Sequence, residues 1–156
     1  MGRSAVVDVS RAPAREADPY SWARRQADLL RAGRLGEIDP AGLAEEIDDL
    51  GEEQYDKLES ALRVVLLHLL KWDHQPERRS RTWAASIREQ RRRVLRRLRK
   101  NPGLKSRLEE ALADAYEDAC DEASGETGLP LTDFPVVRPY EYAEFMDRPV
   151  VWPGDE

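Results

Sequence analysis

The residues best suited to chemistry are the carboxylates and histidines of one long predicted helix. Glu45, Glu46 and Asp49 are followed by His68, and His74 lies beyond it. Carboxylate and imidazole groups inside a helical bundle can hold iron, manganese or zinc. The usual signature, a Glu followed three residues later by a His on two helices, does not occur in the sequence. His68 would also lie about 33 Å from Glu46 along a straight helix that rises about 1.5 Å per residue. We therefore expect no metal site and no cofactor.

Nucleophilic catalysis has little support either. The single cysteine, Cys120, lies among Asp118, Asp121 and Glu122, whose negative charges would raise the pKa of the thiol and lower its reactivity. The serines have no histidine nearby in the sequence, and no glycine-rich phosphate loop follows a strand. An enzyme is therefore the least favoured functional class. If the protein were one, a metal-dependent or hydrolytic reaction at the carboxylates of residues 45–49 would be the form to test.

Several polar residues fall where the helical pattern expects apolar ones: Gln26, Glu46, His68, Gln90 and Arg91. Because buried polar groups are seldom left without partners, this set predicts a structural hydrogen-bond network rather than a catalytic site. Arg91 lies within the apolar arc of its helix, so we expect it to be largely buried and paired with a carboxylate, for which Glu46 is a natural candidate. His68 is expected to be a satisfied core histidine rather than a metal ligand.

A basic stripe follows the third predicted helix within residues 88–107. Its cations lie opposite the apolar face of that helix: Arg88, Arg92, Arg93, Arg96, Arg97, Arg99 and Lys100. Such a stripe can neutralise phosphates, so weak nucleic-acid binding is an alternative function. No aromatic residues interleave with these cations, as stacking on single strands would require, and acidic helices of the same bundle can neutralise them. We therefore expect the stripe to be mostly neutralised or solvated, without specific nucleic-acid affinity.

The net charge of −6 conceals a separation of the two signs along the chain. Residues 37–59 carry ten acidic residues against one lysine, residues 63–107 carry fifteen basic residues against three acidic ones, and residues 108–156 carry fourteen acidic residues against two arginines. The corresponding net charges are −9, +12 and −12. Such blocks of one sign predict strongly charged helix faces.

Four main helices are predicted from apolar residues at the helical period and from the residues that cap them. Asp18-Pro19 and Asp39-Pro40 each place an N-cap before a proline in the first turn. The first helix should end at Gly33 and the second near Trp72, with Gly51 as its one internal position for a bend. The third and fourth helices are expected after the X-Pro pairs at residues 75–76 and 101–102.

The sequence thus predicts an all-α, antiparallel up-and-down bundle of about four main helices with an irregular C-terminal tail. We expect residues 1–17 to be a flexible lead-in, residues 18–148 to form the bundle domain with its tail, and residues 149–156 to form the C-terminal end. At 156 residues the chain has the usual length of one domain.

The second half of the second helix carries apolar side chains around its full circumference, in residues 62–70. Such a helix must be surrounded by other elements. If the short first helix covers residues 43–50, we expect Leu67 and Leu70 to stay exposed and to form an interface with Trp72, most simply in a homodimer. The alternative is that residues 131–156 fold back over this surface. The leading functional hypothesis is therefore a non-enzymatic module that binds an unknown protein partner or itself.

The same composition predicts a cytoplasmic protein. One cysteine cannot form an internal disulfide, and nothing resembling a signal peptide opens the sequence. The longest apolar run, residues 64–70, is interrupted by His68 and is far shorter than the roughly 20 residues that cross a bilayer. We therefore expect no membrane association.

Several motifs, in this order, resemble one known family. They are Trp22 with residues 26–34, residues 43–51, 68–72 and 75–80, Trp83, Ile87, residues 90–91, 102–104 and 126–130, and Phe134-Pro135. Together they are similar to the Domain of Unknown Function family 29, a bacterial and especially cyanobacterial group, over roughly residues 18–148. Gly42 and Arg138 stand where that family commonly has Asn and often has Cys. The resemblance implies an all-helical bundle and no activity, because the family has no assigned catalytic or binding residues.

Overall fold

The computed structural model describes residues 14–153, and every regular element in that range is a helix. Five α-helices follow one another: α1 Pro19–Arg31, α2 Pro40–His74, α3 Arg81–Lys100, α4 Leu108–Thr127 and α5 Tyr142–Asp147. Short 3₁₀ segments lie between them. Within the described range, none of the helices has the length and apolar character needed to cross a membrane. The predicted all-α helical bundle is confirmed.

The chain divides into two compact units, one ending at Leu50 and the other beginning at Gly51. The division lies inside α2, which is one uninterrupted helix, and it coincides with the glycine predicted as a position for a bend. Of the predicted lead-in, residues 1–13 lie outside the described residues, and residues 14–17 form a turn that leads into α1. Near the other end, Val150 is buried in the core although it follows the predicted end of the bundle.

Local capping explains where the helices begin and end. The Asp18 carboxylate accepts a hydrogen bond from the backbone N–H of Ser21 at 2.9 Å, and Asp39 accepts one from that of Gly42 at 3.0 Å. The third helix begins later than its proline suggested, because Pro76 opens a 3₁₀ turn and Ser80 provides the N-cap of α3. At the end of α4, Gly128 takes a left-handed conformation with a φ of 75°.

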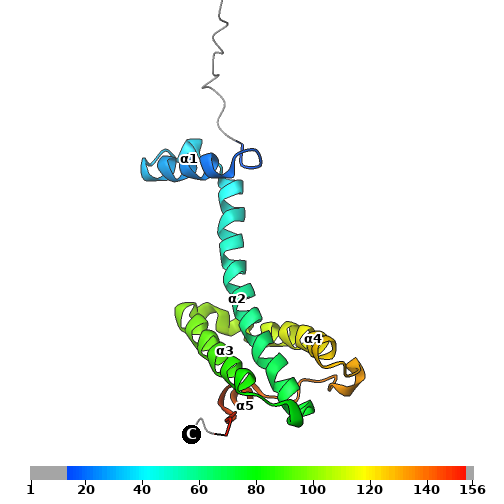
Figure 1. Ribbon diagram of the computed structural model, residues 1–156. Helices are drawn as coiled ribbons and strands as arrows, with labels where there is room; N and C mark the ends of the chain where they lie inside the picture. The colour runs from blue at the N-terminus through cyan, green and yellow to red at the C-terminus, as the bar shows by residue number, and fades with distance from the viewer. Residues whose placement is uncertain (1–13, 154–156) are drawn as a thin grey trace, which may run out of the picture. The chain divides into compact units, whose positions relative to one another are not determined.

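In the first unit, the side chains of α1 bind the residue that caps α2. Trp22 Nε1 donates to Asp39 Oδ2 at 3.2 Å, and Gln26 Oε1 accepts from the backbone N–H of Asp39 at 2.7 Å. Gly42 is buried beside Trp22, where a Cβ atom would lie 2.8 Å from the indole ring. Figure 1 shows the result, in which α1 crosses the beginning of α2 instead of running alongside it.

This crossing leaves apolar surface uncovered in the first unit. We expected the first helix to cover residues 43–50, but Ile47 and Leu50 are exposed. Among the described residues of this unit, Trp22 and Leu29 are the only large apolar side chains that are buried. The expectation was wrong because it assumed antiparallel packing, whereas the hydrogen bonds of α1 tie it to the first turn of α2.

The second unit holds the hydrophobic core. Figure 1 shows α3 and α4 on either side of the second half of α2. The largest completely buried aliphatic side chains come from all three helices: Leu58, Leu62, Val65, Leu66, Leu69 and Leu70 from α2, Ile87 and Val94 from α3, and Leu112 from α4. Small residues of α4, including Ala115 and Ala119, are completely buried as well and allow that helix to approach closely.

Polar contacts fasten the C-terminal tail to this core. Arg148 binds Asp73 through both terminal nitrogens, at 2.5 and 2.8 Å, and the Tyr140 hydroxyl donates to the same carboxylate. From α3, Arg91 donates to the backbone carbonyl oxygens of Phe145 at 2.7 Å and Arg148 at 2.8 Å. The tail is therefore an integral layer of the second unit.

The predicted interface of Leu67, Leu70 and Trp72 is wrong in its premise, because all three residues are buried within the chain. They share one core cluster with residues of the tail, which include Phe134, Tyr140, Phe145, Met146 and Val150. The physical reason is that the tail supplies the apolar surface that helices α3 and α4 alone do not provide. The alternative weighed from the sequence, in which the tail folds back over this surface, describes the structure.

Candidate functional site

The residues of the predicted polar network have separate partners. Gln26 is buried as expected and serves the N-terminus of α2. Glu46 is exposed, contrary to expectation, and lies 3.3 Å from the guanidinium of Arg15. Both residues belong to the first unit, whereas His68, Gln90 and Arg91 belong to the second.

His68 has the structural role that was expected. It is half-buried, and its Nδ1 lies 2.8 Å from the carbonyl oxygen of Val64, one turn earlier. Burial lowers the pKa of His68, which keeps the imidazole neutral at neutral pH. Gln90 is half-buried on α3, where it lines a shallow cleft against α2.

The partners of Arg91 differ from the predicted carboxylate. The side chain is half-buried, but it binds two backbone carbonyl oxygens of the tail, and among the described residues it pairs with no carboxylate. Burial lowers the pKa of Arg91, and the nearby charge of Asp147 opposes that effect. Arg91 thus holds the tail through hydrogen bonds to its backbone, whereas Glu46 pairs with Arg15.

The carboxylates considered for metal binding do not converge. Glu45 and Glu46 both pair with Arg15, with nitrogen–oxygen distances of 2.6 and 3.3 Å, and Asp49 is exposed. Across residues 14–153, no group of three or more His, Cys, Asp or Glu side chains is arranged to hold a metal ion.

The basic stripe is largely solvated. Arg88, Arg92, Arg93, Arg96, Arg99 and Lys100 are exposed on α3, and Arg97 is half-buried. Arg93 pairs with Glu89 of the same helix at 2.6 Å, and Arg97 donates to Gln54 at 2.7 Å. One leucine, Leu95, lies at the edge of this face with 55% of its surface exposed.

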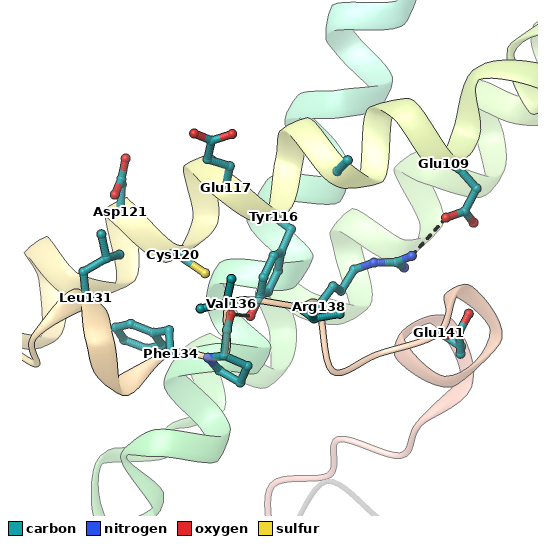
Figure 2. Close-up of a pocket in the computed structure, with 13 residues that line it drawn as sticks. Glu109, Tyr116, Glu117, Cys120, Asp121, Leu131, Phe134, Val136, Arg138 and Glu141 are labelled. Carbon is teal, nitrogen blue, oxygen red and sulfur yellow. Dashed lines mark hydrogen bonds and ion pairs between the residues drawn. The ribbon is translucent and has the colours of Figure 1, made fainter.

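A groove lies between α4 and the tail in the second unit (Figure 2). Its cavity volume is ≈ 670 Å³, which falls within the range of about 300 to 1,000 Å³ that is common for binding sites. Its lining residues come from α4, from the tail segment that follows it and from the residue before α5: Glu109, Ala113, Tyr116, Glu117, Cys120, Asp121, Leu131, Phe134, Pro135, Val136, Val137, Arg138 and Glu141.

The floor of the groove is apolar and holds no activated side chain among the described residues. Figure 2 shows Tyr116 and Cys120 of α4 facing Phe134 of the tail. The Tyr116 hydroxyl donates to the carbonyl oxygen of Pro135 at 2.6 Å, and burial raises the pKa of this phenol. Burial also raises the pKa of the Cys120 thiol, so the thiol stays protonated at neutral pH. The groove therefore offers contact surface rather than an activated nucleophile.

The sides of the groove combine exposed apolar residues with acidic ones. Val136 is 99% exposed and Val137 79% exposed, so the tail presents two valines to solvent. Arg138 Nη2 binds Glu109 at 3.0 Å, which neutralises one of the four lining carboxylates. The remaining three are Glu117, Asp121 and Glu141, and all are exposed.

Comparison with known families identifies the chain. The model of the family described as Domain of unknown function DUF29 matches residues 15–150. The chain belongs to this family. No curated protein and no solved structure shows a significant match to it. The match begins at Arg15, which binds the first turns of α2, and ends at Val150, which is buried in the core.

In this DUF29 protein, sequence reasoning missed the groove because its two walls are remote in the chain. A weak signal was present, since Val136 and Val137 lie between Pro135 and Pro139, where no helix can bury them. The buried aromatic residues Phe134 and Tyr140 anchor both ends of this short segment. Because Phe134 and Tyr140 are buried on either side, the two valines between them stay on the surface.

Proposed function

We propose that this DUF29 protein is a non-enzymatic interaction module that binds a basic, apolar segment of a partner protein in the groove between α4 and the tail. The observation that carries the proposal is the combination of exposed valines and carboxylates around one recess. An apolar patch rimmed by polar residues is typical of protein-binding surfaces.

The chemistry of the ligand follows from the charges of the groove. Glu117, Asp121 and Glu141 give the lining a net charge of −3 once Glu109 is paired with Arg138. A ligand with a large apolar side chain between lysines or arginines would match both properties, because charge complementarity selects the partner and speeds the encounter. An acidic ligand would be repelled.

A direct test uses a fluorescent peptide in which one leucine is flanked on both sides by arginines. We expect it to bind, with an affinity that weakens as salt is added. The variant Val136→Ser/Asp121→Asn should weaken binding by about tenfold or more, which corresponds to about 1.4 kcal/mol. The matched control Val151→Ser/Glu144→Gln changes exposed residues of the same types outside the groove and should bind like the wild type.

Both groove substitutions are at exposed positions, so circular dichroism should show an unchanged fold. A peptide in which glutamates replace the arginines should not bind. Equal binding of the arginine peptide to the groove variant and to the control variant would refute the proposal.

Weak binding of a polyanion through α3 is the second candidate function. It is favoured by six exposed cations of the basic stripe on one helix: Arg88, Arg92, Arg93, Arg96, Arg99 and Lys100. If six or more cations met phosphates together, affinity would fall by roughly a thousandfold or more between about 50 and 200 mM salt. Tight binding of double-stranded DNA with that salt dependence would rank this function first.

A further inference from the structure

The exposed face of α3 has a composition that is complementary to the groove. Leu95 is followed around the helix surface by Arg99, Arg92 and Arg96, which all lie on the same side of it and are all exposed. On its other side, the apolar residues Val94 and Leu98 are buried in the core, whereas 55% of the surface of Leu95 is exposed. This surface, the basic face of α3, is therefore one exposed apolar side chain bordered on one side by three arginines.

The acidic side chains of α4 form no ion pair with this basic face in residues 14–153, the part of the chain that the structure describes. Their ion pairs reach other elements instead: Glu109 pairs with Arg138 of the tail, Glu110 with Arg107, Glu122 with Arg63 and Glu126 with Lys71. In the described part of the chain, no hydrogen bond or ion pair holds Arg92, Arg96 or Arg99.

We infer that the groove of one copy of this protein receives the basic face of α3 from a second copy, with Leu95 inserted between the valines and the floor of the groove. This inference rests on the proposed function of the groove and names its occupant. In this arrangement the three arginines beside Leu95 would meet the three groove carboxylates that have no ion pair among the described residues, Glu117, Asp121 and Glu141. The mode is a helix in a groove, with an apolar anchor and a charged rim.

A single chain cannot make this contact, because α3 and α4 lie on either side of α2 (Figure 1). The basic face and the groove are also different surfaces, so the interface is heterologous rather than two-fold. Each copy offers one of each surface, which leads to end-to-end chains or to a closed ring.

Reciprocal variants test the inference. In Arg92→Ala/Leu95→Ala the basic face loses its anchor, and in Glu117→Lys/Asp121→Lys the groove repels arginine; all four positions are exposed, so the fold should persist. We expect nuclease-treated wild-type protein to show a mass above that of the monomer that rises with concentration and falls with salt. Each variant alone should self-associate about tenfold more weakly or worse.

The decisive sample is the equimolar mixture of the two variants. It contains one intact groove and one intact basic face, so sedimentation velocity should show a heterodimer that grows no further. The controls Leu30→Ala and Asp118→Lys change an exposed leucine and an exposed acidic residue outside both surfaces and should assemble like the wild type. A monomeric wild type, or a mixture that yields no heterodimer, would overturn the inference.

The labelled arginine–leucine peptide separates this inference from the proposed function. If that peptide binds the groove while the wild type stays monomeric, the groove is a binding site whose occupant is another protein. If the wild type is monomeric and the peptide fails as well, both proposals fall. In the supporting case, a peptide of residues 88–100 should compete with assembly.

Discussion

Replacing Arg91 with methionine should loosen the tail and lower the stability of the second unit. The change keeps most of the apolar stem of the side chain but removes two hydrogen bonds, to the carbonyl oxygens of Phe145 at 2.7 Å and Arg148 at 2.8 Å. Those carbonyls belong to the segment that fastens Phe145, a completely buried side chain. The perturbation therefore tests whether α3 holds the tail through this one guanidinium.

The size of the effect follows from the bonds that are lost. A hydrogen bond from a charged group contributes about 1.5 to 3 kcal/mol to the free energy of unfolding. Against two such bonds stands the cost of burying the guanidinium, whose Nη2 has no hydrogen-bond partner among the described residues. We expect a net loss of about 3 kcal/mol, which for a chain of this length corresponds to a fall of about 6 to 12 °C in the melting temperature.

Thermal unfolding followed by circular dichroism, with a urea titration as a second measurement, decides the matter. The control is Arg92→Met, because Arg92 is the exposed neighbour on the same helix. We expect the control to melt within about 1 °C of the wild type. If Arg91→Met does the same, the two hydrogen bonds contribute no net stability and the tail is held by its apolar contacts alone.

Two further predictions concern other positions. Gly42→Ala should lower the free energy of unfolding by about 1 to 3 kcal/mol, because the added methyl would press on the Asp39 cap and lie 2.8 Å from the Trp22 ring. At Gly51 an added methyl meets nothing within 4 Å, so Gly51→Ala should raise the free energy of unfolding by about 0.5 to 1 kcal/mol in the same thermal melt. Burial raises the pKa of the Asp73 carboxyl, but the hydrogen bonds from Arg148 and Tyr140 lower it by more. The pKa of Asp73 therefore lies below the ordinary value of 3.8. The carboxylate therefore stabilises the fold above the ordinary pKa, and this contribution is lost as pH falls through the lowered pKa. In urea titrations, the stability gap between the wild type and Asp73→Asn should narrow over that range and stay constant near neutral pH.

Local signals in the sequence predicted the helices well, since caps depend on residues three positions apart. The prolines after Asp18 and Asp39 marked two helix starts, and Gly33 marked the end of α1. The course of α1 was harder to predict, because it depends on an indole N–H that reaches Asp39 across 17 residues. Periodicity alone pointed to antiparallel packing and missed that contact.

The difference between local and long-range contacts also explains the errors at the candidate sites. Arg91 looked like half of an ion pair because a buried charge needs a partner, but its hydrogen bonds reach backbone carbonyls 54 and 57 residues away. Backbone carbonyls leave no trace in the sequence. Leu67 and Leu70 were expected to be exposed because the short first helix was assigned to residues 43–50, yet both are buried and Tyr140 ties the tail to Asp73.

The separation of charge along the chain was visible in the sequence, and the structure shows why it matters. Acidic and basic side chains on one helix would neutralise each other at spacings of three or four residues. However, α3 contains a single acidic residue, Glu89, which forms an ion pair with Arg93. The core beneath is built mainly from aliphatic and aromatic side chains, and these charges lie outside it. Because the Debye length is about 8 Å at physiological ionic strength, contacts between the basic face and an acidic groove would respond to salt while the apolar core would not. A fold that keeps its two charged surfaces apart can therefore exchange its partners without unfolding, which favours a reversible interaction module over a permanent assembly.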